Sequence, residues 1–182
     1  GQLALVPARS ESFDKSVPSL QVFNHVIAAV RSGNKYYWLD GTNEAAAFDS
    51  VPFIHPLTVF VINFDGTYRF VETPPMDDHK DFSSLELKSI IDGEGNAEVY
   101  FTHSFSGKAA EWSRIFYKYL SPEQRKTSYE RRGIEVKELN FSSFTDTDKP
   151  FVINLKGIYK NMAQKLDENT MVLTNTVRLD SY

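Results

Sequence analysis

The sequence predicts an α+β protein built mostly from antiparallel β structure, and three observations indicate this. Aromatic residues make up 14% of the chain, and aromatic side chains favour strands. Short runs of β-branched and aromatic residues alternate with turn signals such as Asp65-Gly66. One stretch, residues 107–120, instead repeats its apolar side chains every three or four residues, which is the spacing of a helix.

Length and composition limit the classes of protein to which the chain can belong. With 182 residues it can hold one medium domain or two small ones. The net charge of −4 gives no reason to expect a nucleic-acid partner, and no apolar run approaches the length of a membrane span. The absence of cysteine excludes a disulfide scaffold and a thiolate metal site. We therefore expect no metal and no cofactor.

The first part of the chain, residues 1–75, is expected to be a series of strands. Residues 7–20 and 41–56 are expected as loops, and Asp65-Gly66 predicts a two-residue type I′ hairpin turn. Two prolines in residues 73–80 indicate a linker, which sets the domain boundary between residues 75 and 76. The expected strands are Leu3–Val6, Val22–Val30, Lys35–Asp40, Val59–Phe64 and Thr67–Val71.

The second part, residues 76–182, is expected to be a β-rich domain with helices near residues 107–132. The apolar stripe of the first helix should pack onto the sheet. Ser121 is the expected N-cap of a second helix, with Pro122 at its first position and Gly133 just after its end. The stripe consists of Ala109, Trp112, Phe116 and Leu120. The expected strands are Ser84–Ile91, Ala97–Phe105, Ile134–Leu139, Phe151–Tyr159 and Met171–Leu179.

His25 and Asp40 form the most informative pair in the sequence, because a hairpin register brings them together. If Ser32-Gly33 closes the loop, or if the loop has four residues, His25 lies directly opposite Asp40. Opposed side chains on one face have Cβ atoms about 5 Å apart, within reach of a hydrogen bond. A His held by a carboxylate is the orienting half of a nucleophile–His–acid triad. The alternative is a structural His and a turn-capping Asp. Trp38 lies on the same face. We expect it to form a wall of the active site, and the alternative is that it is an aromatic residue of the core.

Two sequence blocks resemble the transglutaminase-like superfamily. Phe23-Asn-His-Val-Ile27, followed by Tyr37-Trp-Leu-Asp-Gly-Thr42, is similar to the His and Asp blocks of that family. The resemblance extends through Val17–Leu20, Val59–Asn63 and Val71–Pro74, and covers roughly residues 1–75. It is to large bacterial proteins in which a β-rich domain precedes the transglutaminase-like core and another follows it. The resemblance implies a partial papain-like β-sheet followed by a β-sandwich-like domain with a helical insertion, whose role is not established.

The resemblance also implies roles for single residues. His25 would take the proton of a thiol, and Asp40 would orient the imidazole. Thr42 fits the family's Asp-Pro-Thr, although Gly41 stands in place of the proline. The family's cysteine precedes the histidine at the start of a helix, which lowers the pKa of the thiol. This sequence has none, so we expect a cysteine upstream of residue 1, in a fragment that is inactive alone; a non-catalytic parent is the alternative.

By this resemblance the parent is an acyltransferase or cysteine protease with a protein or peptide substrate. Export to the periplasm or cell surface is one expectation by family, although the sequence itself indicates no compartment and no oligomeric state. Two rival hypotheses stay open: a non-enzymatic β module for binding or structural support, and an arylamine acyltransferase-like enzyme with the same Cys–His–Asp order. The proline linker and β-rich second domain argue against the latter. A carbohydrate- or peptide-binding role for residues 76–182 would need exposed aromatics such as Trp112 or Tyr117.

The remaining candidates are each weighed against a simpler interpretation. Asp77-Asp78-His79 carries metal-ligand side chains, but adjacent linker residues form a solvated charge run more readily. His55 has no assigned role, and His103 is expected in the core or at a strand edge. A basic group in the helical region is diluted by acids, so a solvated helix face is expected rather than a nucleic-acid site. This group consists of Lys118, Arg125, Lys126, Arg131 and Arg132.

Overall fold

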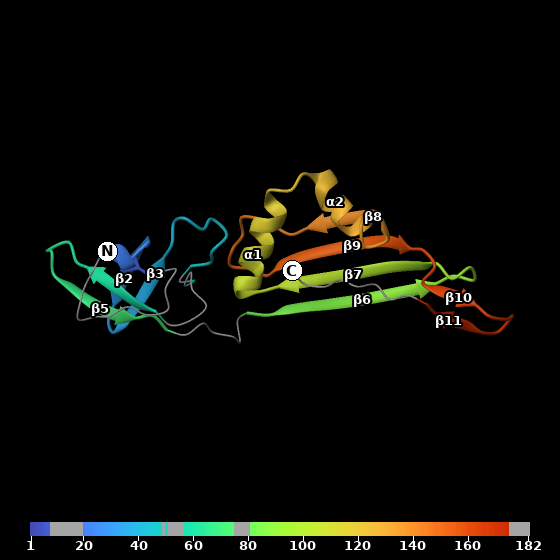
Figure 1. Cartoon of the computed structure of the whole chain (residues 1–182), viewed down its shortest axis with the longest axis horizontal. Helices are drawn as coiled ribbons and strands as arrows, with labels where there is room; N and C mark the ends of the chain where they lie inside the picture. The colour runs from blue at the N-terminus through green and yellow to red at the C-terminus, as the bar shows by residue number, and fades with distance from the viewer. Residues whose placement is uncertain (8–19, 49, 51–56, 75–80, 175–182) are drawn as a thin grey trace. The chain divides into compact units, whose positions relative to one another are not determined.

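The computed structural model describes residues 1–7, 20–48, 50, 57–74 and 81–174 (Figure 1). The chain divides into two compact units, Gly1–Lys80 and Asp81–Tyr182, so the division falls at the C-terminal end of the expected linker, five residues beyond the expected position. The structure is mostly antiparallel β with two helices, which confirms the predicted α+β class.

Unit 1 (Gly1–Lys80) contains one antiparallel sheet with the strand order β3-β2-β1-β4-β5. A short 3₁₀ helix, Leu20–Val22, precedes β2. Strands β1, β2 and β4 alternate buried side chains with more exposed ones, so one face of the sheet carries the core. The strands are β1 (Gln2–Val6), β2 (His25–Ser32), β3 (Lys35–Leu39), β4 (Thr58–Ile62) and β5 (Tyr68–Glu72). The core consists of Ala4, Val6, Ile27, Ala29, Trp38, Leu57, Val59 and Val61.

The predicted type I′ turn at Asp65-Gly66 is wrong, although the hairpin itself is present. Ile62 pairs with Tyr68, and the amide of Asn63 donates to the carbonyl of Thr67 at 2.8 Å, so the loop has three residues. Gly66 takes φ +81°, the left-handed conformation that ends such three-residue loops. The pairing is therefore one residue out of the predicted register, which changes which side chains share a face.

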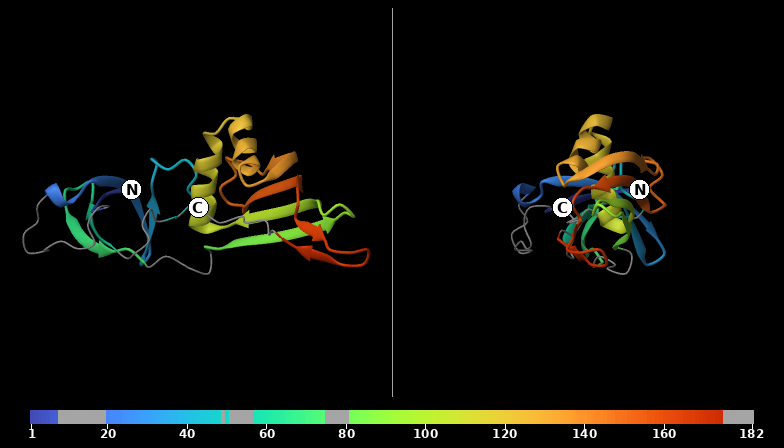
Figure 2. Two further views of the ribbon diagram at one scale, coloured as in Figure 1. Left: turned by 45° about the vertical axis from the view of Figure 1, so that its right-hand side comes forward. Right: turned by 90° about the vertical axis from the view of Figure 1, so that its right-hand side faces the viewer.

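Unit 2 (Asp81–Tyr182) contains a four-stranded antiparallel sheet with the order β6-β7-β9-β8. Helices α1 (Gly107–Lys118) and α2 (Pro122–Glu130) connect β7 to β8 and cover one face of the sheet (Figure 2). The strands are β6 (Ser83–Ile91), β7 (Ala97–Phe105), β8 (Ile134–Phe141) and β9 (Phe151–Tyr159), with a small hairpin of β10 (Ala163–Lys165) and β11 (Met171–Leu173). Among the described residues, the helices occupy the layer that a second sheet would fill in the expected β-sandwich-like arrangement.

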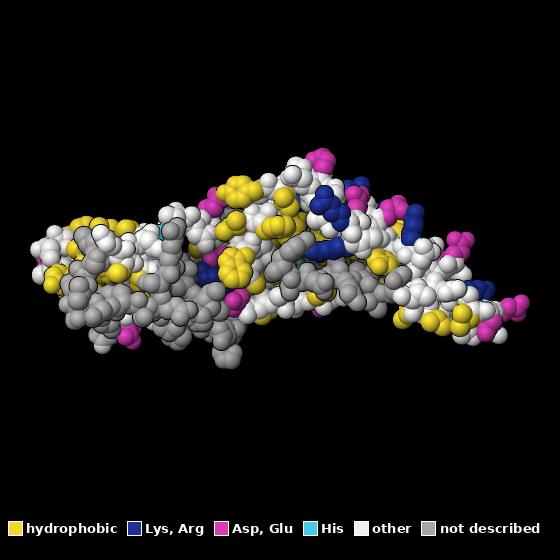
Figure 3. Space-filling view, in the orientation of Figure 1, with side chains coloured by type: hydrophobic (Ala, Val, Ile, Leu, Met, Phe, Trp, Pro, Cys, Tyr) yellow, Lys and Arg dark blue, Asp and Glu magenta, His cyan; other side chains and the backbone are white. Residues whose placement is uncertain are grey.

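The first helix was predicted in the right place, but only part of its predicted apolar stripe faces the sheet: Ala109 and Leu120 pack against the core. Ala110, Arg114 and Tyr117 are buried against the sheet, whereas Trp112 is 58% exposed and Phe116 is also exposed. Hydrophobic side chains accordingly lie on the surface over α1 (Figure 3). The arginine reaches past the helix and donates to the backbone carbonyls of Asp146 and Lys149. A polar side chain with such hydrogen-bond partners can be buried. The spacing of hydrophobic residues in the sequence does not predict this burial.

The second helix begins as predicted. The hydroxyl of Ser121 accepts from the amide of Gln124, and the Gln124 side chain accepts from the amide of Ser121, which completes a capping box. Pro122 occupies the first turn. Gly133 was predicted as the first residue after the C-cap. The C-cap is Arg131, so Gly133 is the second residue after it, and its φ is +86°.

Candidate functional site: a histidine–aspartate pair

The β2–β3 hairpin carries the candidate site, in a register different from the predicted one. Ser32 pairs with Lys35, so the two-residue loop is Gly33-Asn34 rather than Ser32-Gly33. Gly33, the first residue of the loop, takes φ +60°. The turns that close two-residue hairpin loops need a positive φ at this position, and glycine adopts it readily. Trp38 therefore pairs with Ala29 instead of Ile27. The predicted direct opposition of His25 and Asp40 is wrong.

The two side chains meet nevertheless. His25 Nε2 lies 2.8 Å from Asp40 Oδ2. The register differs from the prediction by two residues, and an even shift leaves every side chain on its original face. The pair is therefore diagonal across the hairpin, where a long imidazole side chain still reaches its neighbour. His25 begins β2 and Asp40 directly follows β3, so both lie at the open end of the hairpin.

The two carboxylate oxygens of Asp40 have separate partners. Oδ2 faces His25, while Oδ1 accepts from the Thr42 amide at 2.9 Å and from the Thr42 hydroxyl at 2.6 Å. The Asp40 side chain is only 4% exposed, and that of His25 is 25% exposed. The carboxylate is thus fixed in the protein, while the imidazole is partly exposed to solvent.

These contacts determine the charge state of Asp40. Burial by itself raises the pKa of the carboxyl, but the hydrogen bonds accepted from Thr42 and His25 outweigh it, and the pKa lies below its ordinary value. An ionised carboxylate only accepts hydrogen bonds, so His25 Nε2 must carry the proton of their shared bond. In the neutral ring the lone pair is then on Nδ1, which is the nitrogen available to act as a base.

A second Asp-Gly-Thr segment in unit 1 shows which part of this geometry is purely local. In Asp65-Gly66-Thr67, the aspartate Oδ1 also accepts from the threonine amide at 2.9 Å and hydroxyl at 2.6 Å. The Asp–Thr contact is therefore a local turn that this tripeptide forms at both of its positions in unit 1. The sequence interpretation gave a turn-capping aspartate as the alternative role of Asp40, and the repeated tripeptide was a further signal for that turn. Contact with a histidine is what distinguishes Asp40 from Asp65.

Trp38 lies in the core rather than beside an open site. Its side chain is 2% exposed, and its ring stacks on Tyr36 with centroids 5.4 Å apart. Its burial favours the alternative of a core aromatic over contact with a substrate. It lies on the face that includes Ile27 and Ala29, which are also buried, so it helps to hold the hairpin that carries the pair.

The other predicted candidates fall elsewhere. His103 lies on β7, 2.7 Å from the Ser83 hydroxyl, and burial followed by the charge of Arg132 lowers its pKa. Arg125 is not a free surface cation, since its Nε donates to the Tyr117 carbonyl at 2.7 Å and its guanidinium lies over Phe144. Asp77-Asp78-His79 and His55 lie outside the described residues.

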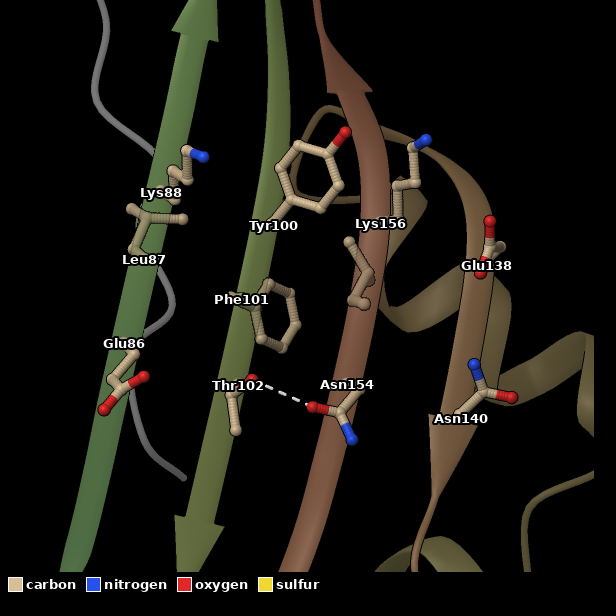
Figure 4. A pocket seen from close by; sticks show the side chains of 11 residues that line it. Glu86, Leu87, Lys88, Tyr100, Phe101, Thr102, Glu138, Asn140, Asn154 and Lys156 are labelled. Atoms are coloured by element: carbon tan, nitrogen blue, oxygen red, sulfur yellow. Dashed lines mark hydrogen bonds between the residues drawn. The ribbon is translucent and has the colours of Figure 1, made fainter.

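Unit 2 offers a hollow rather than a catalytic cluster. The face of the sheet opposite the helices is a shallow depression of about 530 Å³ (Figure 4). Its floor is polar, and the Thr102 hydroxyl donates to the Asn154 amide oxygen at 2.8 Å.

In the described parts of the chain, no three metal-ligating side chains gather. Within those same ranges, no helix has the length and apolar character to cross a membrane.

Comparison with known proteins adds no identity to this geometry. The chain matches no family model, no curated protein and no solved structure. Function must therefore be argued from the His25–Asp40 pair itself.

Proposed function

We propose that residues 1–80 supply the histidine and aspartate of a Cys–His–Asp acyl-transfer centre in a transglutaminase-like thiol enzyme. The single observation that carries this proposal is the 2.8 Å contact between His25 Nε2 and Asp40 Oδ2. The chain contains no cysteine, so the thiol must come from a polypeptide segment outside these 182 residues. Without that segment the chain has no activity.

The geometry supports a specific division of labour. Nδ1 of His25 takes the thiol proton, and the resulting thiolate attacks the carbonyl carbon of an amide to give a tetrahedral intermediate. The imidazolium returns the proton to the departing amine, which leaves a thioester. A second amine or water then attacks the thioester and restores the thiol. Asp40 stabilises the imidazolium and holds the tautomer that exposes Nδ1.

The acid of such a centre must stay ionised and immobile, and Asp40 meets both requirements. Its depressed pKa keeps it charged at neutral pH, and Thr42 holds the oxygen that does not face His25. A protein or peptide amide is the substrate class that this chemistry serves. No cofactor is needed, because the three side chains supply the nucleophile, the proton transfer and the orientation.

The gene region upstream of the codon for Gly1 provides the first test. We expect it to encode, in frame, a cysteine at the start of a helix, where the helix N-terminus lowers the thiol pKa. An open reading frame without any cysteine there refutes the proposal. In that case the non-catalytic β module is favoured.

The second test measures thiol reactivity in the full-length product. Iodoacetamide should label the cysteine rapidly at neutral pH, and His25→Ala should slow labelling by roughly tenfold or more, because an unpaired thiol is mostly protonated. Asp40→Ala should slow it through loss of orientation. Asp65→Ala is the matched control, since Asp65 makes the same turn without a histidine. Equal rates in all four proteins would contradict the proposal.

The tautomer of His25 can be read in the present chain without any thiol. The ¹⁵N shifts of a neutral His25 ring should show the proton on Nε2, and Asp40→Ala should allow both tautomers to be populated. Asp65→Ala should leave the spectrum of His25 unchanged. A proton on Nδ1 in the unsubstituted chain would show that the nitrogen assigned as the base is not available.

A further inference from the structure

Strand β6 forms an edge of the unit 2 sheet, and its side chains are unusually exposed. All nine residues are solvent-accessible, and Ser89 is the only one that is half-buried. Leu87 is 42% exposed although it lies on the helix-covered face, because α1 and α2 pack against β7, β9 and β8 instead. In the described part of the sheet, no strand lies beyond β6 (Figure 1). A long, exposed edge strand with unpaired backbone groups is a template for pairing with another strand.

The hydrogen bonds at both ends of the β6–β7 hairpin show which backbone groups point outward. The amide of Asp92 donates to the carbonyl of Asn96, and the amide of Ser106 donates to the carbonyl of Phe82, both at 2.8 Å. In an antiparallel ladder, every second residue bonds to the same neighbour. Even-numbered residues of β6 therefore direct their N–H and C=O groups at β7. The odd-numbered residues, with Leu87 at the centre, present theirs at the edge.

The side chains of β6 are self-complementary about Leu87. When a second copy of the strand lies antiparallel with the two Leu87 residues opposite each other, the outward-facing backbone groups meet in hydrogen-bonded pairs. In that register Glu86 lies opposite Lys88 of the other copy, and Lys88 lies opposite Glu86. These are non-hydrogen-bonded pairs, in which side chains approach most closely.

Charge selects this register over its neighbours. A shift of the axis by one residue toward the N-terminus puts Glu86 opposite Glu86, and a shift the other way puts Lys88 opposite Lys88. Like charges directly opposite are destabilising. In the single chain, neither Glu86 nor Lys88 forms an ion pair with a described residue. Both project from the open face of the sheet, whereas Leu87 between them points to the helix-covered face (Figure 4). A charged residue that only protects an edge does not require an opposite charge at its partner position.

We propose that unit 2 associates with a second copy of the chain through β6, about a two-fold axis at Leu87, to form one continuous eight-stranded antiparallel sheet. The interface places Leu87 against its copy on the helix-side face and two Glu86–Lys88 pairs on the open face. One strand pair is a small interface, so the dimer dissociates in the micromolar range. This inference does not depend on the acyl-transfer proposal.

Sedimentation equilibrium of the whole chain across the micromolar range tests the dimer. Glu86→Lys and Lys88→Glu each place two like-charge pairs in the interface, and each should weaken association roughly tenfold. The double variant Glu86→Lys/Lys88→Glu exchanges the charges and should restore association. Glu138→Lys on β8 is the matched control and should behave as the unsubstituted chain does.

Leu87→Pro provides an independent variant that the single chain should tolerate. Proline is accepted on an edge strand where its missing N–H would face solvent, yet in the dimer it removes the two central hydrogen bonds. We expect a folded monomer. A monomeric unsubstituted chain at every concentration overturns the proposal. Equal association in the single and double charge variants overturns it as well.

Discussion

At the scale of single residues, Asp40 shows how a local turn becomes part of a site. Asp40-Gly41-Thr42 and Asp65-Gly66-Thr67 form the same hydrogen bonds, with the same lengths. Only Asp40 also contacts an imidazole, because β2 delivers His25 to its second oxygen. The tripeptide explains why the carboxylate is rigid. The sheet explains why that rigidity has a use in proton transfer.

The depressed pKa of Asp40 predicts how the stability of unit 1 depends on pH. The folded pKa lies below the unfolded value of about 4, so this carboxylate stabilises the fold above that pH. The contribution is lost as the pH falls through the folded pKa. Asp40→Asn should therefore destabilise unit 1 at neutral pH and cost progressively less below about pH 4. Urea unfolding of both proteins over this range measures the difference. A constant difference would contradict the assignment.

At the scale of elements, Gly95 controls how the β10–β11 hairpin joins unit 2. Its carbonyl accepts from the Ala163 amide at 2.9 Å, and its φ is +89°. A Cβ at this position would lie 1.9 Å from the Ala163 carbonyl oxygen, so the two backbones meet too closely for any side chain.

We predict that Gly95→Ala separates β10 from the β6–β7 loop. The left-handed backbone alone costs roughly 1–3 kcal/mol for a residue with a Cβ, and the clash adds to that. Chemical unfolding should show the loss, and hydrogen exchange at the Ala163 amide should accelerate. Gly93→Ala in the same loop is the control, because a Cβ there meets nothing within 4 Å. Equal effects at both glycines would show that close approach is not the cause.

The hairpins and helix α1 also show where the structure differs from the sequence-based prediction. Hairpin turns were predicted at Ser32-Gly33 and Asp65-Gly66, and both hairpins formed, yet each has a register that differs from the prediction. The number of loop residues depends on a few backbone angles at Gly33 and Gly66, which composition does not specify. The burial of Arg114 on α1 was missed because this side chain finds carbonyl partners in a loop that is distant in sequence. Local propensity carries no information about such partners.

At the scale of the whole molecule, the division into two units predicts separable responses to mutation. Phe151 is fully buried in unit 2, among Phe105, Phe141 and Phe144. Phe151→Ala should cost unit 2 roughly 3–5 kcal/mol, as removal of a buried aromatic ring does. The Nε2–H tautomer of His25 in unit 1 should be unaffected. Val152→Ala, at the adjacent half-buried position, is the control.

That experiment also has a clear contrary outcome. If Phe151→Ala changes the ring nitrogen shifts of His25, the two units do not respond separately. Because each unit has its own core cluster, we expect unit 2 to unfold at lower denaturant concentration while unit 1 keeps its transition.

The sequence by itself determined the fold class, the number and order of most elements, the boundary region between the units and the capping of α2, because these follow from periodicity and local turn chemistry. It also determined that His25 and Asp40 share a face, since an even error in register leaves faces unchanged. Only the tertiary structure decided that the pair meets diagonally, that Trp38 is buried in the core, that α1 turns Trp112 outward, and that β6 is left as an edge. Each of these depends on which distant segments pack together, and local sequence patterns do not determine the free energy of that packing.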